Sequence, residues 1–99
     1  MLNIKKTQND GVLTFNLEGR LDTTTSPQLE EEINANISGI KELIFDLETL
    51  EYISSAGLRV LLAAQKTMNK QGNMTVIHVS EEVMEIFEVT GFSDILTIQ

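Results

Sequence analysis

Cysteine is absent from this 99-residue chain, and histidine occurs only once, at His78. The first absence excludes a disulfide scaffold, a thiolate zinc site and a cysteine nucleophile. Because the single histidine falls in an expected strand and there is no G-x-S-x-G motif, serine hydrolase chemistry is not supported. No histidine and carboxylate residues have the sequence spacing of metal ligands, and no P-loop motif is present. We therefore expect no enzyme activity, no metal and no cofactor.

Basic residues are also scarce, because 7 Lys and Arg stand against 15 Asp and Glu, which gives a formal net charge of −8. This balance argues against nucleic acid and against an anionic membrane surface, since both require a concentrated basic face. The longest apolar runs, such as 60–64, are too short for a transmembrane helix or for the apolar core of a signal peptide. These absences favour a cytoplasmic protein whose partners are other proteins.

Alternating apolar residues predict an N-terminal hairpin. Residues 2–8 alternate weakly and are expected to form an edge strand, and Asp10-Gly11 is a strong two-residue turn signal. In the next strand, 12–17, the apolar residues of one face indicate half-burial in an antiparallel pair. Residues 19–22 are then expected to leave the sheet.

Helices and strands alternate in the rest of the chain. Each of three expected helices begins after a serine and ends at a glycine, and the pairs are Ser26 and Gly39, Ser54 and Gly72, and Ser80 and Gly91. Pro27 suits the first helical position, and the apolar stripe of the first helix continues to Ile40. Strands are expected at 42–47 and 74–79, with a last short strand at 95–98.

The predicted order is therefore β-β-α-β-α-β-α-(β). A hairpin followed by alternating helices and strands gives an α/β fold with a mixed sheet of four to five strands and helices packed on it. A chain of 99 residues is the size of one domain, so residues 1–99 are expected to form a single unit.

The segment Leu43–Leu62 combines three features that suit a binding surface. Asp46 ends the expected strand and is expected at the rim of the sheet. Ser54 and Ser55 stand at the start of a helix, where free N–H groups and the helix dipole favour a phosphate. Gly57 has no side chain to shield that first turn, so the backbone stays open there. A phosphate there adds about 1.5 to 2 negative charges, and Arg59, one turn on, is positioned to pair with it. Both serines are also explained as simple helix caps, Asp46 as a turn former and Arg59 as a solvated helix residue.

These residues resemble a known family. Ile53-Ser54-Ser55-Ala56-Gly57-Leu58, preceded by Phe45-Asp46-Leu47, is similar to the signature of STAS domains and, more narrowly, of bacterial anti-sigma factor antagonists. The upstream segment Leu17-Glu18-Gly19-Arg20-Leu21-Asp22 matches the family's second-strand pattern. The resemblance covers nearly the whole chain in order and without insertions, and it implies a single STAS domain over residues 1–99.

The resemblance implies a partner switch. The unmodified protein binds an anti-sigma factor that is also a serine kinase and frees a sigma factor, phosphorylation separates the two, and a serine phosphatase restores binding. The family's acceptor serine falls on Ser55, with Ser54 as the second candidate. Ala56 replaces a common second hydroxyl, Ser54 replaces an Asp, and Arg59 replaces a small residue. The residues expected to bind the partner or support phosphorylation are Asp22, Ser54, Ser55, Ala56, Gly57 and Arg59.

Asp46 is carried over as a structural acid. A second hypothesis is a constitutive accessory subunit of a membrane transport complex, a role in which STAS-like domains often lack a phosphorylatable serine. The presence of Ser54 and Ser55 favours the switch.

Overall fold

A computed structural model describes residues 1–99 as a four-stranded sheet with three α-helices. The order β-β-α-β-α-β-α confirms the predicted α/β fold. The elements are β1 (Leu2–Asn9), β2 (Val12–Leu21), α1 (Ser26–Asn36), β3 (Glu42–Ile53), α2 (Ser55–Gln71), β4 (Asn73–Ile77), α3 (Glu81–Thr90) and the 3-10 helix η1 (Phe92–Asp94).

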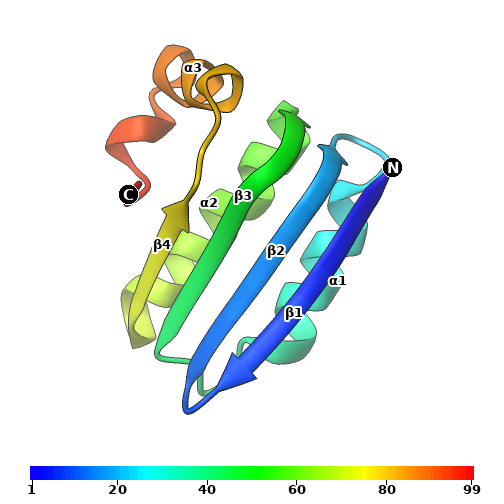
Figure 1. The fold of residues 1–99 in the computed structure, drawn as a ribbon. Coiled ribbons are helices and arrows are strands. Elements are labelled where there is room, and N and C mark those ends of the chain that lie inside the picture. The colour runs from blue at the N-terminus through cyan, green and yellow to red at the C-terminus, as the bar shows by residue number, and fades with distance from the viewer.

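The sheet is mixed and its strands lie in sequence order, β1-β2-β3-β4 (Figure 1). β1 and β2 are antiparallel, and Asp10 and Gly11 form the turn between them with φ of 50° and 81°. β2 pairs with β3 and β3 with β4 in parallel, so helices connect these strands. The predicted hairpin and mixed sheet are both confirmed.

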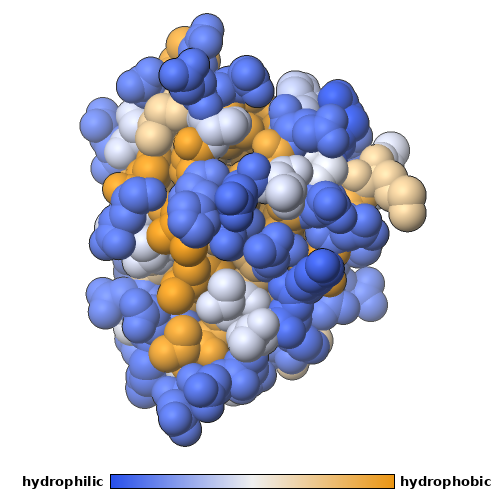
Figure 2. All heavy atoms as spheres, viewed as in Figure 1, coloured by the Kyte–Doolittle hydropathy of each residue, from blue (hydrophilic) through white to orange (hydrophobic).

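Helices α1 and α2 lie together on one face of the sheet, behind it in Figure 1. The buried apolar side chains form one core of 23 residues, which includes the stacked rings of Phe15 and Phe45 and also Val83 and Phe87 of α3. The opposite face of the sheet presents mainly hydrophilic side chains, with apolar ones between them (Figure 2). No helix is long and apolar enough to cross a membrane.

Strands β2 and β3 are longer than the sequence pattern predicts. β2 continues to Leu21 and β3 to Ile53, so the prediction that residues 19–22 leave the sheet is wrong for all but Asp22. Two register shifts, opposite 16–18 and 19–20 of β2, each place one extra residue in β3 and interrupt the alternation of buried residues in that strand. In β2 the alternation continues to Leu21, but Gly19 takes the place of an apolar residue. The added length carries the ends of both strands to the rim of the sheet.

The ends of α1 differ from prediction by small shifts, whereas those of α2 agree with it. The N-cap of α1 is Thr25 rather than Ser26, and the helix ends at Asn36, so Gly39 does not close it. Ile40 is buried but lies in the following turn, where its N–H donates to the Ile37 carbonyl at 3.1 Å. At α3 the predicted start after Ser80 and end at Gly91, which has φ of 81°, are confirmed.

The predicted last strand at 95–98 is reduced to one bridge between Val76 and Ile98. The 3-10 helix η1 and its C-cap Ile95 occupy the residues before this bridge. The chain therefore forms hydrogen bonds with the edge of β4 only at its last residues. The sheet therefore has four strands rather than five.

Candidate functional site

The candidate site lies at the carboxyl ends of β2 and β3, the upper end of the sheet in Figure 1. The Ser54 N–H donates to the Leu21 carbonyl at 2.9 Å, which joins the last residue of β2 to the N-cap of α2. Asp22 follows Leu21 directly. The parallel pairing of β2 and β3 therefore brings together two loops that are more than thirty residues apart in the sequence.

The first turn of α2 treats its two serines differently. Ser54 is the half-buried N-cap, and its hydroxyl accepts a hydrogen bond from the Gly57 N–H at 3.3 Å. Ser55 is the first helical residue, and its side chain is exposed. The first N–H groups of a helix have no acceptor within the helix. Leu21 accepts from the Ser54 N–H and the Ser54 hydroxyl from the Gly57 N–H, so the N–H groups of Ser55 and Ala56 remain as free donors at the positive end of a 17-residue helix. The hydroxyl of Ser55 is thus accessible beside two amides suited to an anion.

Gly57 sets how closely α2 approaches the strands. A Cβ at this position would lie 2.7 Å from Leu21 Cγ and 2.9 Å from Ile53 Cγ1, closer than carbon atoms normally approach. Both neighbours are almost completely buried. Only glycine allows the first turn of α2 to lie directly on the ends of β2 and β3.

A shallow hollow of about 260 Å³ separates the first turns of α1 and α2. Ala56 and Arg59 line it from α2, facing Pro27 and Glu30 of α1 and Thr23 of the preceding loop. We refer to this hollow and the exposed first turn of α2, with Ser55, as the docking face. Of the predicted residues, this face contains Ser55, Ala56 and Arg59, whereas Ser54 is half-buried, Gly57 is buried and Asp22 does not line the hollow.

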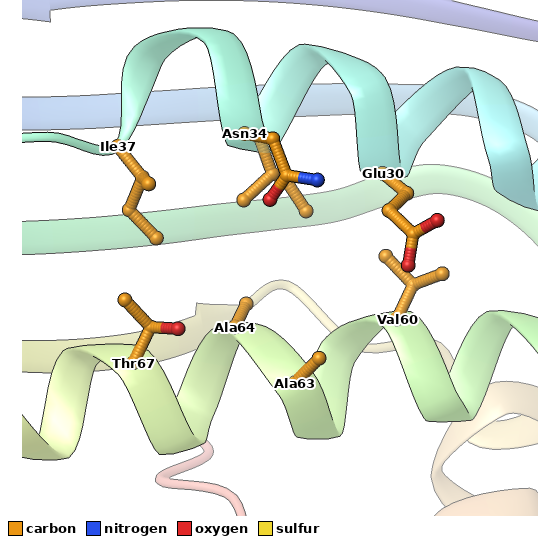
Figure 3. A pocket seen from close by; sticks show the side chains of 8 residues that line it. Glu30, Asn34, Ile37, Val60, Ala63, Ala64 and Thr67 are labelled. Atoms are coloured by element: carbon orange, nitrogen blue, oxygen red, sulfur yellow. The ribbon is translucent and has the colours of Figure 1, made fainter.

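A narrower groove continues from the hollow along α1 and α2. Glu30 and Val60 line both, and beyond them Asn34 and Ile37 face Ala63, Ala64 and Thr67 across a space of about 50 Å³ (Figure 3). The small side chains of the two alanines leave this space open. The helical layer thus has a second, smaller depression next to the docking face, and Glu30 and Val60 lie between the two.

Asp22 organises the loop that leads into α1. Its Oδ1 accepts hydrogen bonds from the Thr24 hydroxyl at 2.8 Å, the Thr24 N–H at 3.0 Å and the Thr25 N–H at 3.1 Å. The Thr24 hydroxyl contributes most to holding the pKa of this carboxyl below its ordinary value, against an opposing effect of desolvation. Through these contacts Oδ1 of Asp22 holds the loop together, and its Oδ2 lies 4.0 Å from Nε of Arg20.

Replacing Asp22 by Asn is expected to lower stability near neutral pH and to have little effect in strong acid. A carboxyl with a lowered pKa in the folded state stabilises the fold above its unfolded pKa, and this contribution is lost as the pH falls through the folded value. The measurement is the thermal unfolding temperature of the wild type and of Asp22→Asn, from neutral pH to strong acid. A gap in unfolding temperature that stays constant into acid would contradict the assignment.

Two residues beside the site were missed by the sequence patterns. The Arg20 guanidinium lies 4.4 Å from the ring centroid of Tyr52, and these residues are paired at the ends of β2 and β3. Tyr52 is one of the few large apolar side chains that remain exposed. Without the register shifts, the pairing of Asn16 with Asp46 would set Arg20 opposite Leu50, so extending the two strands does not by itself predict this contact.

Asp46 lies apart from this site. It points to the open face of the sheet, with its side chain 15% exposed, and its Oδ1 is 3.0 Å from Nδ1 of His78. Asn16 Nδ2 donates to its other oxygen at 3.5 Å. Its position within β3, rather than at the rim, results from the extension of that strand to Ile53.

Comparison with known proteins gives consistent matches. The STAS domain family model matches residues 3–99. BtrV of Bordetella bronchiseptica, assigned as an anti-sigma factor antagonist, is 37% identical over 91 residues, which are 90% of this chain and 78% of that protein. The anti-sigma-B factor antagonist of Staphylococcus aureus is 29% identical over 99 residues, 98% of this chain and 92% of that protein. An anti-sigma factor antagonist from Mycobacterium paratuberculosis shares the fold, with a TM-score of 0.89, 24% identity and coverage of 99% of this chain and 85% of that one.

Proposed function

This chain belongs to the STAS domain family, and we propose that it is an anti-sigma factor antagonist whose binding is controlled by phosphorylation of Ser55. The observation that carries the proposal is the exposure of Ser55 on the first turn of α2, beside free backbone amides. The names of the relatives indicate the anti-sigma factor as partner. The kinase, the phosphatase and the switch itself are parts of the proposal.

Ser55 is favoured over Ser54 as the acceptor because of their different contacts. The Ser54 hydroxyl caps Gly57 and is half-buried, so phosphorylation there removes a capping interaction worth about 1 kcal/mol. The Ser55 hydroxyl makes no capping hydrogen bond that phosphorylation would remove. In the proposed step, Ser55 Oγ attacks the γ-phosphorus of ATP in the kinase, its proton passes to a base of the kinase, and ADP leaves.

The unmodified docking face suits a close protein contact. Ser55 is small and neutral, Ala56 and Gly57 keep the first turn of α2 low, and Arg59 offers a hydrogen-bonding cation at the edge of the hollow. Arg20 and Tyr52 beside it are residue types that often dominate binding energy. A dianionic phosphate at the centre of such a contact must be desolvated, which costs several kcal/mol if it finds no partner.

The same proposal treats the chain as a regulator without catalytic activity of its own. An anti-sigma factor antagonist acts where sigma factors act, which places the chain in the cytoplasm. A serine phosphatase returns Ser55 to its hydroxyl form, and residues 1–99 work as one STAS domain. The exposed Ser55 also favours this role over that of a constitutive transport subunit, which needs no modifiable serine.

The proposal is tested by incubating the protein with the anti-sigma factor kinase of its own organism and ATP, followed by intact mass measurement. We expect one added phosphate on the wild type and on Ser54→Ala, and none on Ser55→Ala. A phosphate that remains on Ser55→Ala but is lost from Ser54→Ala would move the acceptor to Ser54. Absence of phosphate from every variant, with an active kinase, would contradict the switch.

A further inference from the structure

The open face of the sheet holds a cluster of side chains that the proposed function does not use. Asp46, Glu48 and His78 each place one potential ligand atom within 4.8 Å of the others. Asp46 and His78 are 32 residues apart, which is why no motif marks them in the sequence. The cluster lies on the side of the sheet opposite α1 and α2, away from the docking face.

The backbone explains why these side chains converge. Asp46 and Glu48 are two residues apart in β3, so both point to the open face. Ile77, the last residue of β4, pairs with Asp46. His78 comes next and has a φ of 57°, in the left-handed region that few residues other than glycine adopt. This turn directs the imidazole back over β3, with Nδ1 at 3.0 Å from Asp46 Oδ1.

The central carboxylate of the cluster is fixed before any ligand arrives. Asp46 is only 15% exposed, accepts a hydrogen bond from the Glu48 N–H at 3.1 Å through Oδ1, and has Asn16 Nδ2 at 3.5 Å from Oδ2. Such outer contacts orient metal-ligating carboxylates in known sites. The Glu48 side chain is exposed and has the freedom to complete a coordination shell.

The donor set is chemically specific. Two carboxylate oxygens alone form an acidic cluster, whereas an added imidazole nitrogen makes a mixed set that suits zinc and similar first-row ions better than calcium or magnesium. Two carboxylates held this close repel each other on a chain of net charge −8, and a divalent cation removes that repulsion. We propose that Asp46, Glu48 and His78 form a binding site for a divalent transition-metal ion such as Zn²⁺.

Binding requires a neutral imidazole whose Nδ1 lone pair forms the bond to the metal. The imidazole offers this lone pair in the tautomer that carries its proton on Nε2, and water fills the remaining coordination positions. The ion then links β3 to the segment between β4 and α3. It stabilises this connection without covering the docking face.

Calorimetric titration of the metal-free protein with ZnCl₂ tests the site. We expect one Zn²⁺ per chain, with affinity reduced about tenfold or more in His78→Asn and in Glu48→Gln. Asn is chosen because it tolerates the left-handed conformation of His78 better than Ala does. The matched control is Glu51→Gln, an exposed carboxylate of the same strand with the same change of charge, which should bind within about twofold of the wild type.

Because His78 is the only histidine and there is no cysteine, the imidazole signals of the NMR spectrum report directly on the proposed ligand. Zinc should shift them in the wild type and in Glu51→Gln, and should raise the thermal unfolding temperature of both. Absence of saturable 1:1 binding, or equal affinity in His78→Asn, Glu48→Gln and the control, would overturn the proposal. Neither outcome bears on phosphorylation of Ser55.

Discussion

Ser55→Asp is expected to reduce affinity for the anti-sigma factor about 100-fold, which is about 2.7 kcal/mol. The substitution places a carboxylate on the exposed first residue of α2, at the centre of the docking face, where the partner must cover it. Desolvating an unpaired charge in an interface costs several kcal/mol, so a 100-fold loss is a conservative value. The measurement is the dissociation constant of the purified proteins at fixed ionic strength, since salt screens charges at the rim.

Ser55→Asn is the matched control because Asn has nearly the shape of Asp but no charge. Its affinity should stay within about fivefold of the wild type. Loss of folding does not explain the effect of Asp, since an acid in the first turn of a helix is stabilising by about 0.3–1 kcal/mol. If Asp and Asn weaken binding equally, shape rather than charge controls the contact, and the phosphorylation switch loses its physical basis.

Gly57→Ala is expected to destabilise the fold by about 1–2 kcal/mol, although alanine is the better helix former. The added Cβ would meet Leu21 Cγ at 2.7 Å and Ile53 Cγ1 at 2.9 Å, and both of these side chains are almost completely buried. The first turn of α2 must then lift from the strand ends. Thermal unfolding should show a loss of about 4–8 °C per kcal/mol for a domain of this size.

Ala63→Gly in the same helix gives the reference for helix propensity alone. Ala63 is exposed, so glycine there should cost about 1 kcal/mol without any packing effect. Gly57→Ala and Ala63→Gly are thus both expected to destabilise the fold, although one replaces glycine by alanine and the other alanine by glycine. A stabilised Gly57→Ala protein would show that the strand ends accept a methyl group and that close approach is not why glycine stands there. Gly57→Ala should also weaken binding of the anti-sigma factor, because the first turn of α2 that it displaces carries Ser55.

The sequence patterns predicted most of the fold because local signals and burial agree over most of the chain. Asp10-Gly11 takes the positive φ values that its turn requires, and Ser80 and Gly91 bound α3 as expected. Predictions failed where tertiary structure overrides the local pattern. The register shifts concealed the last residues of β3, and Gly19 in place of an apolar residue concealed those of β2. Ile40, which is buried in a turn, falls at the spacing of a helical stripe.

The candidate site was predictable where its residues are consecutive. Ser54 to Gly57 show the start of a helix in the sequence itself, and the structure adds the distinction between the capping Ser54 and the exposed Ser55. The contact of Arg20 with Tyr52 depends on the register of two parallel strands. The approach of His78 to Asp46 depends on the pairing of β3 with β4. No single-sequence pattern contains such long-range geometry.

The most direct test of the central claim compares one preparation in two states. The protein is phosphorylated by its kinase, the modified residue is located by mass spectrometry, and the affinity for the anti-sigma factor is measured before phosphorylation, after it, and again after treatment with a serine phosphatase. We expect phosphate on Ser55, a loss of affinity of about 100-fold or more, and full recovery once the phosphate is removed. Equal affinity of the phosphorylated and unmodified forms would contradict the account.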